Sequence, residues 1–118
     1  MFPRKRNYKE SSEQVKFIMR IRWLHPEILI FAVPNGGTRS KLEAARLKKE
    51  GLLKGIPDVI VAKRTNDYGG LYLEFKTAEG KLSPEQVIIH NKLTAEGYKV
   101  EVVRSCEDAL AVFKEYIG

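Results

Sequence analysis

The chain has 118 residues, 43% of them hydrophobic, which is enough for one domain with a single core but not for two. No window approaches the roughly 20 apolar residues of a membrane-spanning helix, so no membrane partner is expected. A single cysteine, Cys106, excludes an internal disulfide, two histidines make a Cys/His zinc site improbable, and the net charge of +6 favours an acidic partner.

The chain opens with a basic segment and then alternates helix and strand patterns. We expect residues 1–9 to form a mobile basic arm and residues 10–118 to form one domain. In chain order, the expected elements are a helix over 11–24, a strand over 27–33, a helix over 40–50, strands over 58–62 and 71–77, a helix that opens at 83–86 and stops at Gly97, a strand over 98–104, and a helix from 105 nearly to 118. Each helix opens with a serine followed three residues later by Gln, Glu or Asp, which is typical of a capped start. Trp23, in the first helix, is expected in the core.

The predicted order is therefore α-β-α-β-β-α-β-α. The closing β-α-β step favours one parallel strand pair in an otherwise mixed sheet. The predicted fold class is α/β, with a central four-stranded mixed sheet flanked by helices. These elements fill the 118 residues, so we expect no separate DNA-reading module among them.

Two of the expected strands carry a carboxylate within an apolar run. Asp58 lies in IPDVIV (56–61) and Glu74 lies in LYLEFKT (71–77), where a buried carboxylate is costly unless something compensates it. On neighbouring strands, Asp58 and Glu74 would form a two-carboxylate pocket, with Lys76 two residues from one of them. Such oxygen ligands hold Mg²⁺ or Mn²⁺, and a nearby lysine can orient or help deprotonate a water. The pattern predicts metal-dependent phosphodiester cleavage, although Asp58 alone also fits a turn aspartate, and Glu74 with Lys76 fits an exposed ion pair.

The positive charge is concentrated in the first half of the chain. Residues 1–64 carry 15 Lys and Arg against 6 Asp and Glu, whereas residues 65–118 carry 6 against 9. Such a basic half suits a polyanion such as nucleic acid, and a solvated basic surface explains it equally well. The candidate DNA-binding residues on and around the second helix are Asn35, Arg39, Lys41, Arg46, Lys48, Lys49 and Lys54.

A series of short motifs spans nearly the whole chain. They are Glu13, VPNGG (33–37), Gly51, KGIPD (54–58), EFK (74–76), GKLSPEQ (80–86) and GYKV (97–100). In this order they resemble the virus-type replication-repair nuclease (VRR-NUC) family of the PD-(D/E)xK nuclease superfamily. The resemblance implies a restriction-endonuclease-like fold and a metal-dependent nuclease of the stand-alone phage or bacterial type.

The resemblance also assigns roles at the expected site. It implies that Asp58 and Glu74 bind the metal, that the Phe75 carbonyl adds a ligand, and that Lys76 handles the attacking water. It places an acidic residue of the first helix, here Glu13, at the same metal.

Three further residues have more than one interpretation. Glu13 lies near Lys16 at helix spacing, and a surface charge pair explains it as well as a metal site does. Gln86 completes a capping box with Ser83, and the resemblance associates this glutamine with the active site, so both roles are open. His90 stands near a point where some relatives in the superfamily have tyrosine, and we interpret it as structural or close to DNA rather than catalytic.

The sequence therefore predicts a Mg²⁺- or Mn²⁺-dependent DNA endonuclease acting in replication, recombination or repair. With no appended module to read bases, its substrate is expected to be selected by structure, such as a four-way junction or a flap. Because one site cuts one strand, a homodimer is expected. The Asn-Gly-Gly turn lacks the lysine spacing of an ATP-binding loop, so no nucleotide cofactor is expected. The expected location is the cytoplasm of a bacterial or phage-infected cell. The alternatives are a sequence-specific restriction-type endonuclease and a non-catalytic DNA-binding module.

Overall fold

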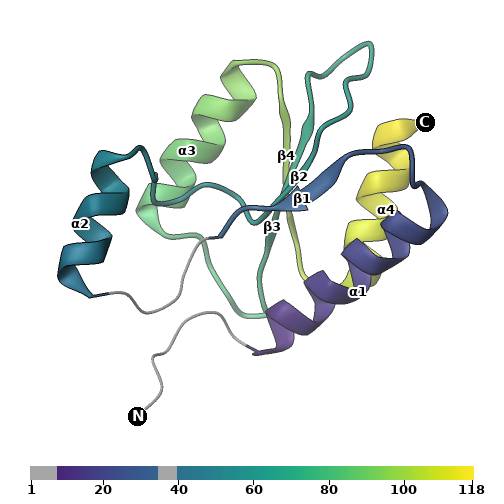
Figure 1. Ribbon diagram of the computed structural model, residues 1–118. Helices are drawn as coiled ribbons and strands as arrows, with labels where there is room; N and C mark the ends of the chain where they lie inside the picture. Colours follow the sequence, from purple (N-terminus) through teal and green to yellow (C-terminus); the bar gives the residue numbers. More distant parts are fainter. Residues whose placement is uncertain (1–7, 35–39) are drawn as a thin grey trace.

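The computed structural model describes residues 8–34 and 40–118 and contains four helices and four strands within them (Figure 1). Their bounds are α1 Tyr8–Leu24, β1 Ile30–Ala32, α2 Lys41–Lys49, β2 Val59–Val61, β3 Leu71–Phe75, α3 Pro84–Ala95, β4 Lys99–Val103 and α4 Cys106–Ile117. This order confirms the predicted α-β-α-β-β-α-β-α series. No helix in the described ranges is long and apolar enough to cross a membrane.

The four strands form one sheet in the order β1-β2-β3-β4. The β1–β2 and β2–β3 pairs are antiparallel, and β3 and β4 are parallel with Leu71 opposite Lys99 and Phe75 opposite Val103. The predicted parallel pair is confirmed, because α3 carries the chain from the end of β3 back to the start of β4.

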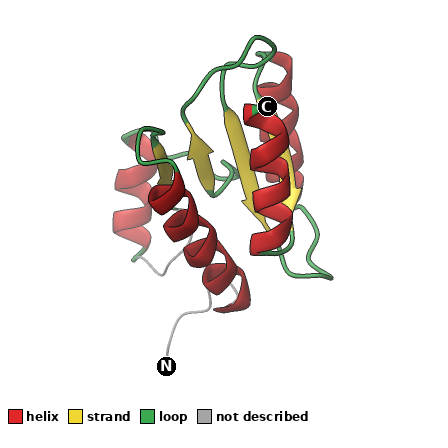
Figure 2. Ribbon diagram, turned by 90° about the vertical axis from the view of Figure 1, so that its right-hand side faces the viewer, coloured by secondary structure: helices red, strands yellow, loops and turns green. Residues whose placement is uncertain are grey.

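The hydrophobic core lies between one face of the sheet and the helices α1 and α4. Alternation along β2 and β3 turns Val59, Val61, Leu71, Leu73 and Phe75 to this face, where all are almost fully buried. Figure 2 shows α1 and α4 on the same side of the strands. From these helices, the rings of Phe17 and Phe113 pack against each other at 6.2 Å, and Phe17 lies 6.0 Å from Phe75. The opposite face of β3 and β4 is covered by α3.

Helix α2 differs from the other three because it packs against no helix or strand in the described parts of the chain. It buries none of its residues, and Leu42 is 83% exposed. Ser40 caps it by accepting the amide hydrogen of Glu43, as the sequence predicts. Local capping and helix propensity thus define α2, and tertiary packing contributes little to it.

Three details of the sequence prediction were wrong. Helix α1 begins at Tyr8, so Ser11 lies inside the helix, and residues 8 and 9 belong to the helix rather than to the basic arm. The helix can start this early because no proline or glycine lies between Tyr8 and Ser11. Strand β1 is shorter than predicted, because the chain first makes a turn after α1, in which the Ile28 amide donates a hydrogen bond to the His25 carbonyl at 3.0 Å. Trp23 is 80% exposed, because it lies off the stripe through Phe17 and Ile21 that faces the core. Residues 1–7 of the predicted arm lie outside the described residues.

Candidate active site

The two predicted carboxylates lie side by side at one end of the β2–β3 pair. Val59 pairs with Leu73 in the antiparallel register, so the next step along both strands sets Asp58 opposite Glu74. Both are buried, with Asp58 5% and Glu74 2% exposed. Buried carboxylates need compensation, and each of these has hydrogen-bond partners.

Asp58 is held by the main chain on both sides. Its Oδ2 accepts the Phe75 amide hydrogen at 2.8 Å, across the gap between β2 and β3. Its own carbonyl accepts the Val33 amide hydrogen at 2.8 Å, and Pro57 before it is buried. The carboxylate therefore has a fixed direction relative to the end of β3.

Glu74 is held by α3, which lies on the face of the sheet opposite the core. Gln86 Nε2 donates to Glu74 Oε2 at 3.1 Å, and His90 Nε2 lies 3.3 Å from Glu74 Oε1. Gln86 and His90 are four residues apart and therefore share one face of the helix. Both oxygens of the Glu74 carboxylate are thus engaged by neighbouring turns of α3.

Gln86 makes both sets of contacts that the sequence left open. Its side-chain Oε1 accepts the backbone amide hydrogen of Ser83 at 2.8 Å. The backbone amide of Gln86 in turn donates to Ser83 Oγ, which completes the capping box. The same side chain reaches Glu74 through Nε2. One amide group therefore links the start of α3 to the carboxylate pair.

Sequence reasoning set His90 aside from the catalytic residues, and the structure brings it to Glu74. It is only 8% exposed. In the sequence, the only indication of this contact was the spacing of four residues between Gln86 and His90, which puts both on the same face of the helix. That spacing did not show that this face would contact Glu74.

The environment of Glu74 changes its acidity. Burial raises the pKa of Glu74 from its ordinary value of 4.5 to about 7, and the neighbouring Asp58 carboxyl also raises it. The His90 hydrogen bond and the charge of Lys76 lower the pKa and offset part of this rise. Two adjacent buried carboxyl groups of this kind fit a divalent cation, which would relieve their repulsion and supply the missing positive charge.

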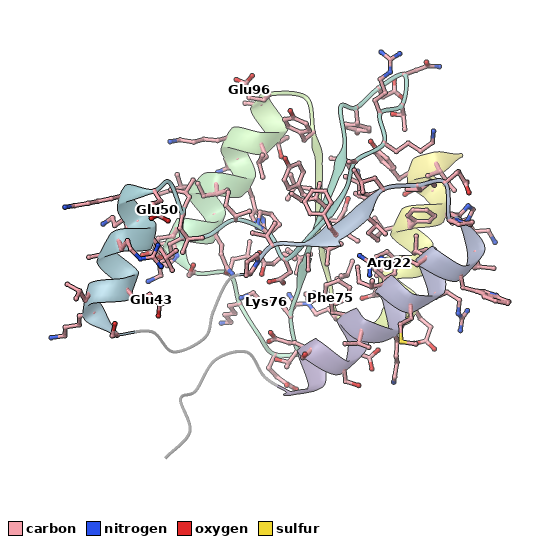
Figure 3. All side chains as sticks on the ribbon, in the orientation of Figure 1. Arg22, Glu43, Glu50, Phe75, Lys76 and Glu96 are labelled. Atoms are coloured by element: carbon pink, nitrogen blue, oxygen red, sulfur yellow. The ribbon has the colours of Figure 1, made fainter. Side chains whose placement is uncertain are left out.

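Lys76 follows directly after β3, where Figure 3 labels it beside Phe75. Its amide donates to the Val103 carbonyl at 2.9 Å, which fixes its backbone to β4. The side chain is half-buried, and its charge acts on Glu74. The structure thus brings Asp58, Glu74 and Lys76 together at one end of the sheet.

The hydrogen bonds described for Glu13 are to Cys106 and Lys16 and not to the carboxylate pair. Its Oε1 accepts the Cys106 amide hydrogen at 2.7 Å, at the start of α4, and its Oε2 lies 3.1 Å from Lys16 Nζ. The Lys16 contact is the charge pair that helix spacing predicts. Within the described residues, no three His, Cys, Asp or Glu side chains gather closely enough to hold a metal ion.

The predicted DNA-binding residues lie mainly on α2 and the loop after it. Arg46 pairs with Glu50 at 2.8 Å and Glu43 at 3.9 Å, and Lys54 Nζ lies 3.9 Å from Glu85 Oε2 at the start of α3. The side chains of Lys41, Lys48 and Lys49 are exposed. Asn35 and Arg39 lie outside the described residues.

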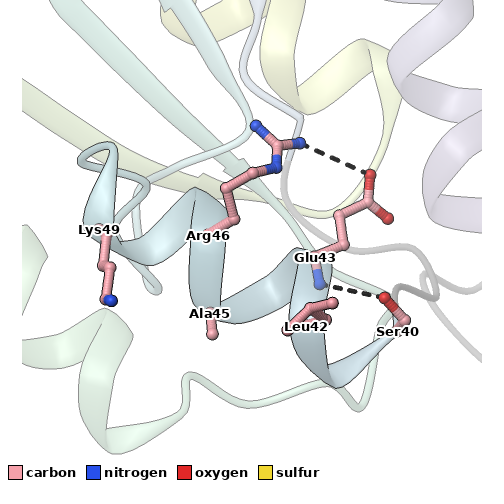
Figure 4. Close-up of a pocket in the computed structure, with 6 residues that line it drawn as sticks. All are labelled: Ser40, Leu42, Glu43, Ala45, Arg46 and Lys49. Atoms are coloured by element: carbon pink, nitrogen blue, oxygen red, sulfur yellow. Dashed lines mark hydrogen bonds and ion pairs between the residues drawn. The ribbon is translucent and has the colours of Figure 1, made fainter.

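A shallow hollow on α2 is separate from the carboxylate pair. Figure 4 shows the residues that line it, which are Ser40, Leu42, Glu43, Ala45, Arg46 and Lys49. The hollow lies on α2, which packs against no helix or strand in the described parts of the chain and so does not reach the ends of β2 and β3. We therefore identify the candidate active site by its carboxylates and not by this hollow.

Fold and site together define an α/β protein of restriction-endonuclease-like architecture with an Asp, Glu and Lys set at the end of its central strands. The model of the VRR-NUC domain family matches residues 8–107, which is most of the chain, and the chain belongs to this nuclease family. No curated protein matches.

Two solved structures have the same fold. The chain is similar to one described as a VRR_NUC domain protein, with 23% identity and a TM-score of 0.78 over 95% of this chain and 90% of that one. It is also similar to one described as a VRR_NUC domain, with 22% identity and a TM-score of 0.65 over 93% of this chain and 99% of that one. At these identities the likeness bears on the fold alone.

Proposed function

We propose that the protein is a DNA endonuclease that hydrolyses phosphodiester bonds with Mg²⁺ or Mn²⁺. The observation that supports this most directly is the buried pair of Asp58 and Glu74 with Lys76 beside it, in a chain of a nuclease family. A buried carboxylate pair is a poor source of stability, since burial and, after it, the neighbouring Asp58 carboxyl raise the pKa of Glu74. A catalytic role gives a reason for its presence.

Asp58 and Glu74 would hold the cation through carboxylate oxygens, and the Phe75 carbonyl would add a third oxygen. The Phe75 amide is directed at Asp58. Because the N–H and C=O of one strand residue lie on the same edge, the Phe75 carbonyl faces this side as well. When bound, the cation polarises the scissile phosphate and neutralises developing negative charge.

The remaining residues act on Glu74 and on water. Gln86 and His90 orient the Glu74 carboxylate from α3. Lys76 would donate a hydrogen bond to the attacking water and hold it in line with the phosphate. Glu13 is proposed as a third carboxylate of the site, which requires its Oε1 to exchange the Cys106 amide for the metal.

The proposed substrate is DNA, selected by its structure. The candidate contacts to phosphates are the basic residues of α2 and the loop after it, which include Lys48, Lys49 and Lys54. A four-way junction or a flap is the proposed preferred structure. We propose that two copies act as a homodimer, since one site cuts one strand, and that the protein works in the cytoplasm.

The decisive test is cleavage of labelled four-way junction, flap, single-stranded and linear duplex DNA, with Mg²⁺, Mn²⁺ or EDTA. Wild type should cut in either metal and not in EDTA. Asp58→Ala and Lys76→Ala should lose cleavage while keeping DNA binding in a parallel gel-shift assay. An active Asp58→Ala protein would refute the site assignment.

The same experiment separates the two alternatives. Cutting of linear duplex at one short sequence would identify a restriction-type enzyme. Binding that needs no metal and leads to no cutting would identify a non-catalytic DNA-binding module. Molar mass in solution, measured with and without junction DNA, tests the homodimer.

A further inference from the structure

Gly55 lies unusually close to the first turn of α3. A Cβ atom added at Gly55 would stand 2.9 Å from both the backbone carbon and the backbone oxygen of Glu85, and 3.2 Å from the amide nitrogen of Gln86. Gly55 also has a φ of +99°, which side-chain-bearing residues rarely adopt. Two separate constraints, one conformational and one steric, therefore favour glycine here.

This contact joins the two segments that hold the carboxylate pair. Gly55 precedes Asp58 by three residues, in the loop that leads into β2. Glu85 directly precedes Gln86, whose side chain donates to Glu74. The backbone of the Asp58 loop thus rests on the helical turn that orients Glu74.

We propose that Gly55 is a positioning residue of the active site. Because it has no side chain, the loop before Asp58 can lie directly on the first turn of α3, and this keeps Gln86 at bonding distance from Glu74. The inference rests on the proposed function for its catalytic consequence, and its structural part can be tested independently.

Both sides of the contact are stiff, so a displacement at Gly55 would reach the site. Between Gly55 and Asp58, the buried Pro57 has a fixed φ and restricts Ile56 to extended conformations. On the helix side, the capping box fixes the Gln86 side chain to Ser83. The exposed Lys54–Glu85 pair lies beside the contact and is too solvated to replace it.

The chain supplies a matched control for the conformational constraint. Gly97, just after α3, has a φ of +96° but no described atom within 4 Å of an added Cβ, and Gly51 has a φ of +110° with the same open space. Alanine at Gly97 or Gly51 therefore tests backbone strain alone. Alanine at Gly55 adds the clash with Glu85.

The first measurement is the Gln86 side-chain amide signal in ¹H–¹⁵N spectra of the full chain without divalent metal, assigned by its loss in Gln86→Ala. Gly55→Ala should shift or broaden this signal, whereas Gly97→Ala and Gly51→Ala should leave it unchanged. The second measurement is Mn²⁺ affinity by calorimetry. Gly55→Ala should bind about 10- to 100-fold more weakly, as is usual when a residue supporting a metal ligand is disturbed, and the controls should stay within about 2-fold.

An unchanged Gln86 signal in a folded Gly55→Ala protein would overturn the inference, whatever its nuclease activity. A Gly55→Ala chain that does not fold would also overturn it, because the clash lies on the α3 side of the sheet and should leave the α1–α4 core intact. If wild type neither binds Mn²⁺ nor cuts DNA, the proposed function fails, and the Gln86 signal still decides whether Gly55 positions this turn.

Discussion

Replacing Glu74 with glutamine should stabilise the metal-free protein above neutral pH while abolishing cleavage. Burial raises the pKa of Glu74 from 4.5 to about 7, so between these values the folded state binds more protons than the unfolded state. Wild-type stability should therefore fall as pH rises through this window. The carboxylate is expected to cost less than about 1 kcal/mol at pH 5, about 2 kcal/mol at pH 6 and about 3 kcal/mol at pH 8.

Glutamine keeps the shape of the side chain without its charge. Its oxygen can still accept from Gln86, but an amide group replaces Glu74 Oε1 beside His90, and the poorer hydrogen bond there costs about 1 kcal/mol at every pH. The net gain for Glu74→Gln should therefore be about 2 kcal/mol at pH 8 and should vanish near pH 5. Divalent metal should then stabilise wild type and not the variant.

The assay is urea unfolding in EDTA at pH 5, 6, 7 and 8, with Glu79→Gln as the control. Glu79 is an exposed glutamate five residues further along, so its replacement changes the same charge outside the site. The difference between Glu74→Gln and wild type should grow with pH, and that for Glu79→Gln should stay small. A difference of the same size at every pH, or a loss of stability at pH 8, would refute the argument that the buried carboxylate is destabilising.

Three other predictions follow from the same contacts. Gln86→Ala should lower both the stability of the protein and its DNA cleavage. Ser83→Ala should lose about 1 kcal/mol of stability through the lost helix cap and keep most of its cleavage activity. Equal cleavage by the two variants would remove Gln86 from the active site. Glu13→Gln should weaken Mn²⁺ binding. Its melting temperature in EDTA should change little, because a glutamine oxygen can still accept the Cys106 amide hydrogen. Unchanged Mn²⁺ binding would show that Glu13 only anchors the start of α4 and does not bind the metal. Lys48→Ala and Lys49→Ala should each reduce the slope of log affinity against log salt by about 0.9 for DNA, and an unchanged slope would place the phosphates elsewhere.

The amino-acid sequence by itself determined the order of the elements and the class of the fold. Its signals are local: the serine at the start of α3 and the alternation along β3 act within a few residues, so they can be read from the chain. Alternation also put Glu74 and Lys76 on one face of the predicted strand over 71–77. The family motifs then indicated that Asp58 belongs beside them. Where local signals were permissive, as at the start of α1, the predicted boundary was wrong.

Only the tertiary structure decided which side chains meet this carboxylate pair. The bonds from Gln86 and His90 to Glu74 join residues 12 and 16 positions apart, and they depend on how α3 packs on the sheet. The bond from the Cys106 amide to Glu13 spans 93 positions and depends on how α1 meets α4. Likewise, Gly55 reads in the sequence as a turn glycine, and its contact with Glu85 becomes visible only once α3 is in place. Packing between distant segments sets these distances, and no local pattern encodes them.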